Sequence, residues 1–175
     1  RDRQEHAQES GCLLKRSQMR IYVDADGFPG MAKDLVVRAA IRLQVPLVFV
    51  ANKRVGHERS ALISSIMVPE GPDVADDSIV EMAAPGDLVI TADIPLADRV
   101  VAKGAFALDP RGKLYTEANI KDRLALRDLL SELRDGGMMT GGPPKFSKKD
   151  CQAFVNQLDS FLVRQLKNKN PHPYA

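Results

Sequence analysis

The sequence predicts an α/β fold, with a mainly parallel β-sheet covered by helices on both faces. Short apolar runs alternate along the chain with stretches in which apolar residues recur at helical spacing. One such stretch joins the first two apolar runs, which makes them a βαβ unit with parallel pairing and a right-handed crossover. Several of the runs also end in an aspartate, and the carboxyl ends of strands are where α/β sheets bind ligands.

Five strands are expected from runs of aliphatic, β-branched or aromatic residues that end at glycine, proline or polar residues. They cover residues 21–23, 47–51, 65–68, 87–92 and 105–108. Helices are expected at about 30–43, 73–83, 96–104, 116–134 and 147–162. If the first three strands grow in one direction and the fourth returns to the other side of the first, the strand order is near 3-2-1-4-5.

The chain of 175 residues is long enough for one domain with its own hydrophobic core. We expect residues 19–168 to form this domain. Residues 1–18 are polar, of mixed charge and without periodicity, so they are expected to be a disordered extension. Residues 169–175 are expected to be a flexible tail.

The composition argues against several classes of protein. A net charge of +2 disfavours a polybasic nucleic-acid binder but leaves room for a local basic groove. Cys12 and Cys151 are far apart and outside any CxxC motif, so they indicate neither a disulfide framework nor a zinc site. No segment approaches the roughly 18 apolar residues of a membrane span, and the N-terminal residues lack the apolar run of a signal peptide. A cytoplasmic protein is expected, and the sequence gives no indication of its oligomeric state.

Five aspartates are candidate metal ligands. Asp24 and Asp26 follow the first strand and Asp93 follows the fourth, so a switch point between these two strands brings all three together. Asp76 and Asp77 lie near the start of the helix at 73–83, where like charges on one face repel. Such a concentration indicates a neutralising cation. Oxygen ligands without His or Cys suit Mg²⁺ or Mn²⁺.

Some of these acids also have a structural interpretation. Asp26 is equally well explained as a turn residue or a helix cap. Asp73 is expected to cap the helix that follows it, because acids at a helix N-terminus complement the macrodipole. The same explanation applies to Asp76 and Asp77.

Polar residues beside the predicted strand ends are candidates for binding a phosphodiester substrate. They are Asn52, Lys53, Thr91, Lys103 and Arg111. Basic side chains on strand-end loops would face the acidic crevice and hold a phosphate backbone. The alternative for each lysine or arginine is an ordinary solvated surface position.

Eight motifs together resemble the bacterial YaiI/YqxD family over residues 19–162. They are Val23-Asp24-Ala25-Asp26 with Pro29, Val50-Ala51-Asn52, Asp73–Asp77, Gly86–Ala97, Lys103-Gly104-Ala105, Pro110-Arg111-Gly112, Tyr115-Thr116 and Gly141-Gly142-Pro143. One departure concerns the residues after the second aspartate, where family members usually have Ala-Cys and this chain has Gly27-Phe28. No role for that cysteine is therefore carried over.

The resemblance groups the chain with PIN-like domains, many of which are metal-dependent ribonucleases. It implies a three-layer α/β/α fold with a mainly parallel sheet of order near 3-2-1-4-5. A PIN-type acidic site would fall on Asp24, on Asp76 or Asp77, and on Asp93, with Asp26 accessory. A family likeness supports a fold more firmly than an activity.

Three functions are compatible with these residues. The leading hypothesis is a Mg²⁺- or Mn²⁺-dependent nuclease acting on RNA, with Asp24, Asp76 and Asp93 as catalytic residues and water as the nucleophile. The second is a non-catalytic module that binds nucleic acid or a protein and keeps its carboxylates for metal-stabilised folding. The third is a haloacid-dehalogenase-type phosphatase with Asp24 as nucleophile. Thr91 and Lys103 would imitate the later motifs of such a phosphatase, but its acidic pair should come after Thr91 rather than before it.

Overall fold

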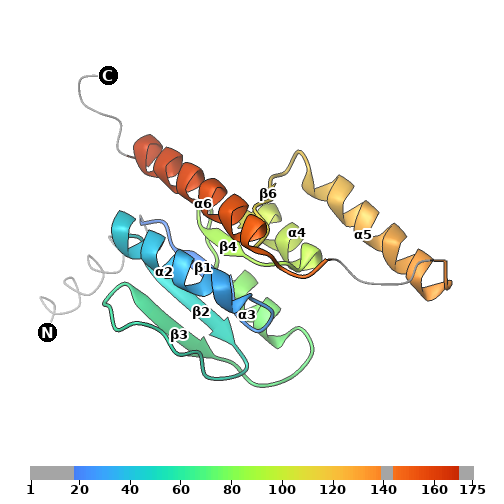
Figure 1. Cartoon of the computed structure of the whole chain (residues 1–175), viewed down its shortest axis with the longest axis horizontal. Coiled ribbons are helices and arrows are strands. Elements are labelled where there is room, and N and C mark those ends of the chain that lie inside the picture. The colour runs from blue at the N-terminus through green and yellow to red at the C-terminus, as the bar shows by residue number, and fades with distance from the viewer. Residues whose placement is uncertain (1–17, 139–143, 170–175) are drawn as a thin grey trace, which may run out of the picture.

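The computed structural model describes residues 18–138 and 144–169 of the chain. Within these residues a six-stranded sheet of order β3-β2-β1-β4-β5-β6 lies between two layers of helices (Figure 1). The predicted α/β class and the predicted order of the first five strands are therefore confirmed. The extension expected at 1–18 and the tail expected at 169–175 fall almost entirely outside the described residues.

The central strand of the sheet is β1. The strands are β1 (Ile21–Asp24), β2 (Leu47–Ala51), β3 (Ile63–Met67), β4 (Leu88–Ile90), β5 (Phe106–Leu108) and β6 (Leu114–Tyr115). β1 pairs in parallel with both β2 and β4, and β3 and β5 extend the parallel sheet on either side. The switch point of the sheet thus falls between β1 and β4, as the sequence predicts.

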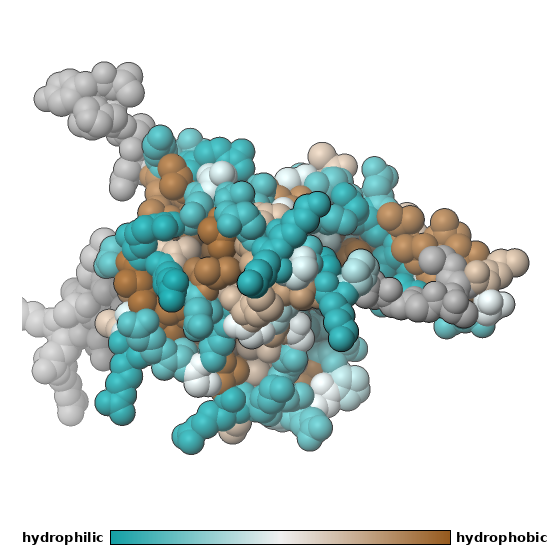
Figure 2. Space-filling view, in the orientation of Figure 1, coloured by the Kyte–Doolittle hydropathy of each residue, from teal (hydrophilic) through white to brown (hydrophobic). Residues whose placement is uncertain are grey.

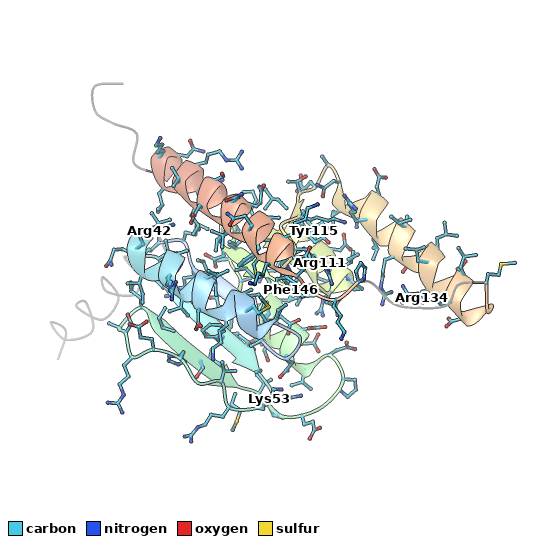
Figure 3. The ribbon with its side chains drawn as sticks, in the orientation of Figure 1. Arg42, Lys53, Arg111, Tyr115, Arg134 and Phe146 are labelled. Atoms are coloured by element: carbon cyan, nitrogen blue, oxygen red, sulfur yellow. The ribbon has the colours of Figure 1, made fainter. Side chains whose placement is uncertain are left out.

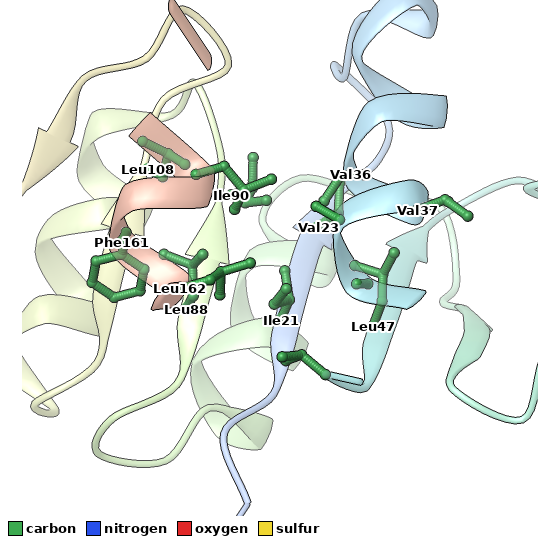
Figure 4. Packing of buried hydrophobic residues seen from close by; sticks show 14 of the residues in the cluster. Ile21, Val23, Val36, Val37, Leu47, Leu88, Ile90, Leu108, Phe161 and Leu162 are labelled. Atoms are coloured by element: carbon green, nitrogen blue, oxygen red, sulfur yellow. The ribbon is translucent and has the colours of Figure 1, made fainter. Parts of the chain in front are cut away.

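Helices cover both faces of the sheet. They are α2 (Gly30–Leu43), α3 (Val74–Met82), α4 (Ile94–Ala102), α5 (Ile120–Asp135) and α6 (Lys148–Lys169). Alternate residues of β1 point to opposite faces, so Ile21 and Val23 pack with α2 and α6 while Tyr22 packs with α3 and α4. Figure 4 shows the first of these two cores, in which side chains from β1, β2, β4 and β5 meet those of α2 and α6.

The strand β6 is an addition to the prediction. It pairs antiparallel with β5 through a tight turn in which the Gly112 N–H donates to the Asp109 carbonyl. Gly112 has a φ of 95°, and a Cβ there would lie 2.8 Å from backbone atoms of Ala153 in α6. The turn therefore requires glycine, and a two-residue strand is too short to leave a period-2 pattern in the sequence.

Two helix starts show how local chemistry decides the boundaries. The helix expected from about residue 116 begins at Ile120, because Asn119 accepts from the Thr116 N–H and donates to the Leu114 carbonyl, which holds a turn. At the start of α6, Ser147 and Asp150 form a capping box, with reciprocal side-chain to backbone bonds. None of the described helices is both long and apolar enough to cross a membrane.

Candidate functional site at the carboxyl edge of the sheet

Asp24 lies at the carboxyl end of β1, next to the end of β4. The hydroxyl of Thr91, the first residue after β4, donates a hydrogen bond to Oδ2 of Asp24 over 3.0 Å. The same hydroxyl accepts the Asp93 N–H, also over 3.0 Å. Thr91 is only 1% exposed. Thr91 thus fixes Asp24 and the backbone at Asp93, and its role in binding a substrate stays a prediction.

Asp93 caps the helix α4. Its Oδ1 accepts the Leu96 N–H over 3.1 Å, and Pro95 occupies the first turn, where the missing N–H costs no hydrogen bond. The cap holds Asp93 at the end of β4, beside Asp24. The sequence placed Asp93 at this edge but did not reveal its capping role.

Asp76 joins these two carboxylates from α3. Burial is the main reason that its pKa rises to about 6, and the negative charges of Asp93, Asp24 and Asp73 add to the effect, opposed by Arg99. Burial also raises the pKa of Asp24, against the stabilising hydrogen bond from Thr91 and with contributions from Asp93 and Asp26. The structure therefore brings Asp24, Asp76 and Asp93 together from a strand, a helix and a strand-to-helix turn.

Asp26 and Asp77 have partners of their own. Both carboxylate oxygens of Asp26 accept the Asn52 N–H, over 3.1 and 3.0 Å, which ties the loop after β1 to the end of β2. Asp77 is paired with Arg99 of α4 over 2.8 Å. Asp26 caps no helix, since the first residue before α2 is Pro29, which has no side-chain cap bond.

Asp73 does not act as the sequence suggests. It occupies the N-cap position of α3, but with a φ of 62° and no hydrogen bond from its side chain to the helix. The expectation of a side-chain cap is wrong: a capping carboxylate needs an extended backbone, whereas the backbone of Asp73 is left-handed and only its carbonyl accepts a helix N–H, that of Asp77.

The carboxylates do not form a finished metal cage. Across residues 18–138 and 144–169, no three His, Cys, Asp or Glu side chains are grouped closely enough to hold an ion. Mg²⁺ and Mn²⁺ sites commonly use one or two carboxylates and complete their coordination with water and phosphate oxygens. The chemistry of Asp24 and Asp93 fits such a sparse site, and the residues Asp26 and Asp77 are already engaged.

The predicted basic residues are dispersed. Lys53 directly follows Asn52 and is exposed at the carboxyl edge (Figure 3). Arg111 follows β5 at the same edge, but it is paired with Asp150 over 2.9 Å and donates to the Pro144 carbonyl. Figure 3 shows Arg111 beside Phe146, whose ring centre lies 5.8 Å from the guanidinium.

Lys103 lies away from the carboxylates. It follows the last residue of α4, whereas Asp93 precedes the first, and a helix rises about 1.5 Å per residue. Its ammonium donates to the carbonyls of Val80 and Glu81 near the end of α3. Lys103 therefore holds α3 against α4 at the amino edge of the sheet.

A cavity of about 500 Å³ lies beside the carboxyl edge, between α2 and the connection from β2 to β3. Its lining consists mostly of charged and polar residues: Lys33, Asp34, Val37, Arg38, Gly56, His57 and Glu58. The ammonium of Lys33 donates to the Gly56 carbonyl, and His57 stacks on Phe49 of β2. This cavity could not be predicted from the sequence, because its two walls are separated along the chain and carry no recognisable motif.

Asp109 also follows a strand, but it is not among the residues predicted for the site. Burial raises its pKa, opposed by the hydrogen bond from the Arg111 N–H. The neighbouring phenol of Tyr115 has its pKa raised to about 12 by burial and by the charge of Asp109. The position of Asp109 directly after β5 was the feature of the sequence that could have identified it. Its carboxylate accepts the Arg111 N–H, so Asp109 shapes the turn into β6.

Comparison with known proteins places the chain among bacterial sequences. The family model described as "Uncharacterized BCR, YaiI/YqxD family" matches residues 22–164. A UPF0178 protein of Geobacter metallireducens is 53% identical over 153 residues, covering 87% of this chain and 99% of that protein. The UPF0178 protein of Solidesulfovibrio magneticus is 57% identical over 144 residues, covering 82% of this chain and 96% of that protein. No solved structure matches the chain.

Proposed function

The chain belongs to the YaiI/YqxD family, and from that premise and the geometry of the carboxyl edge we propose that it is a Mg²⁺- or Mn²⁺-dependent nuclease acting on RNA. The observation that carries the proposal is that Asp24, Asp76 and Asp93 lie close together, where burial first and the neighbouring negative charges second raise the pKa values of Asp24 and Asp76. Three separate elements bring these carboxylates to the switch point of a parallel sheet, where such folds bind ligands. Holding them there costs free energy that a cation would recover.

The three carboxylates are proposed to have different roles. Asp24 and Asp93 are proposed to hold the cation, since Thr91 fixes one and the α4 cap fixes the other. Asp76, with a pKa of about 6, is matched to accept a proton from the attacking water near neutral pH. A bound divalent cation would neutralise charge on the scissile phosphate and orient the water.

The substrate is proposed to be RNA because cations lie beside this acidic edge. Lys53 is exposed one residue beyond the Asp26–Asn52 clamp, and the adjoining cavity is lined in part by Lys33 and Arg38. Phosphate groups bind such flanking basic side chains without base specificity. The carboxylates repel the phosphate backbone of RNA unless a metal cation lies between them. Binding is therefore expected to depend on both salt and metal.

A second candidate function has its own supporting observation. The described residues contain no group of three close metal ligands, which is compatible with a module that binds nucleic acid or a protein without cleaving it. The phosphatase hypothesis loses support, because Lys103, which would have served as its conserved lysine, lies at the far end of α4 from Asp24.

Calorimetric titration of Mn²⁺ into the chelator-treated protein tests the proposal, with Asp93→Asn as the informative variant. Asparagine is also a good N-cap, so the substitution removes the charge while keeping α4 intact. Asp77→Asn is the matched control, because this acid is already paired with Arg99. We expect saturable binding that Asp93→Asn abolishes and Asp77→Asn preserves, together with metal-dependent cleavage of RNA.

The other outcomes separate the candidates. Metal binding and retention of RNA without turnover would favour the binding module. Absence of Mn²⁺ binding in the wild-type protein would contradict the nuclease proposal.

A further inference from the structure

Exposed apolar side chains gather at two places in the described residues. One is the far end of α5, where Figure 2 shows a brown surface and where Leu129 and Met138 are exposed. The other is β3, which forms one edge of the sheet. All of Ser64–Met67 is exposed, and Met67 reaches 71%. The exposed edge of β3 also carries backbone groups, which specify a partner more closely than an apolar surface does.

The backbone of β3 presents an ordered row of donors and acceptors. Toward β2, the Leu62 carbonyl accepts from Leu47 and the Val68 N–H donates to Ala51, so the even-numbered residues face the sheet. In a strand of a parallel pair, the N–H and C=O groups of one residue point to the same side. Those of the next residue point to the opposite side. Ser65 and Met67 therefore direct both of their backbone groups outward, where no hydrogen bond from the described residues reaches them.

This edge lacks the usual protection against pairing. Edge strands are commonly guarded by lysine, proline, bulges or very short length. Ile63–Met67 contains no charged residue and no proline. The opposite edge, β6, is guarded by its length of two residues and by the burial of Tyr115.

We propose that a second copy of this chain docks on β3, so that two β3 strands pair antiparallel about a two-fold axis at Ser65. The outward groups of Ser65 then bond to those of Ser65 in the second copy, and the Met67 N–H donates to the carbonyl of Ile63 in the second copy, a residue whose own N–H already donates to Ser60. Equivalent faces of the two sheets then lie on the same side of the dimer, as an isologous contact requires. The result is one continuous sheet through two molecules, with the acidic edges at opposite ends.

Charge complementarity supports a second copy as the occupant. Arg59 precedes Ser65 by six residues and Glu70 follows it by five, and both are exposed. The two-fold axis brings Arg59 of each molecule to the end of the strand where Glu70 of the other lies. Neither residue has an ion-pair partner within the part of the chain that the structure describes. The proposal does not depend on the nuclease activity.

Sedimentation equilibrium up to about 500 µM protein tests this dimer, since small interfaces are weak. The wild-type chain is expected to form a dimer. Ser65→Pro removes an outward N–H without touching the bonds to β2, so it is expected to weaken dimerisation by about tenfold or more while the melting curve of the monomer is retained. A monomeric wild-type chain, or a dimer unaffected by Ser65→Pro, would overturn the proposal.

Cysteine cross-linking tests the register in a background with Cys12→Ser and Cys151→Ser. In a hydrogen-bonded antiparallel pair the facing Cα atoms lie about 5.5 Å apart, within disulfide range. Ser65→Cys is therefore expected to form a cross-linked dimer on oxidation. Ser64→Cys is the matched control, because its counterpart is displaced diagonally by about 7 to 8 Å. Equal cross-linking by both variants would contradict the assigned axis.

Discussion

Asp24 and Asp87 lie at opposite ends of neighbouring strands and have opposite surroundings. Asp87, at the amino edge just before β4, is 5% exposed, and its two oxygens accept the Arg20 and Ala84 N–H groups over 3.0 and 2.9 Å. Asp24, at the carboxyl edge, accepts one hydroxyl and lies near the negative charges of Asp93 and Asp26. Asp87 joins the segment before β1 to the turn between α3 and β4, whereas Asp24 lies among other negative charges.

The largest effect should follow from Asp24→Asn. If Asp24 holds the catalytic cation, the loss of its charge removes several kcal/mol of transition-state stabilisation, equivalent to a decrease in kcat/KM of about a thousandfold. The free energy of unfolding in EDTA should stay the same or increase, because one of several repelling charges is gone.

Cleavage of RNA in Mn²⁺ and urea denaturation in EDTA measure the two effects of Asp24→Asn. A variant that is destabilised in EDTA would show that Asp24 is a structural carboxylate like Asp87. Retention of full activity would remove Asp24 from the catalytic site.

Asp87→Ala should have the opposite pattern. It leaves the part-buried N–H groups of Arg20 and Ala84 without their carboxylate acceptor, so the free energy of unfolding should fall by about 1 to 3 kcal/mol. Asp87→Asn keeps one acceptor and should cost less. Thermal or urea denaturation measures both, and Mn²⁺ affinity per folded molecule should not change. Unaltered stability in Asp87→Ala would contradict the structural role.

The pH dependence of stability should report on Asp76. Its pKa is raised from 3.8 to about 6 in the folded protein, so between these values the folded state binds more protons than the unfolded state. Stability without metal should therefore decrease as pH rises through this range and stay level above it. Cleavage should change in the opposite direction, increasing as Asp76 loses its proton.

Two variants isolate the contribution of Asp76 to this profile. Asp76→Asn should flatten the decrease in stability, since its side chain no longer titrates. Asp77→Asn, one residue further along α3 and exposed, should preserve the slope. If the Asp76→Asn variant keeps the wild-type pH dependence of stability in EDTA, the titrating group is a different residue.

The sequence predicted those features that depend on local pattern. The apolar runs of β1, β2 and β4 are unambiguous, and the parallel order follows from the helices between them, whereas the two residues of β6 and the start of β3 carry too little periodicity. The strand-end rule likewise placed Asp24 and Asp93 at one edge.

The partners of the acids could not be predicted in the same way. Asp26 is bonded to Asn52 and Asp77 to Arg99, and both contacts depend on how separate elements pack. Asp87 is apparent in the sequence only as the residue before a strand, although Arg20, whose N–H it accepts, is 67 residues away. Position along the chain identifies which carboxylates reach an edge, but not which oxygens stay available there.

Arg99→Ala should give the smallest change in stability and still distinguish the two kinds of carboxylate. The Arg99 and Asp77 side chains are 46% and 65% exposed, so the loss of their ion pair should cost no more than about 0.5 kcal/mol. Arg99 also lowers the pKa of Asp76, so its removal should move the acidic limb of the cleavage profile to higher pH. Arg99→Lys keeps the charge and should move the limb less. A limb that stays in place in Arg99→Ala would show that the proton lost in this range belongs to a group outside the acidic edge.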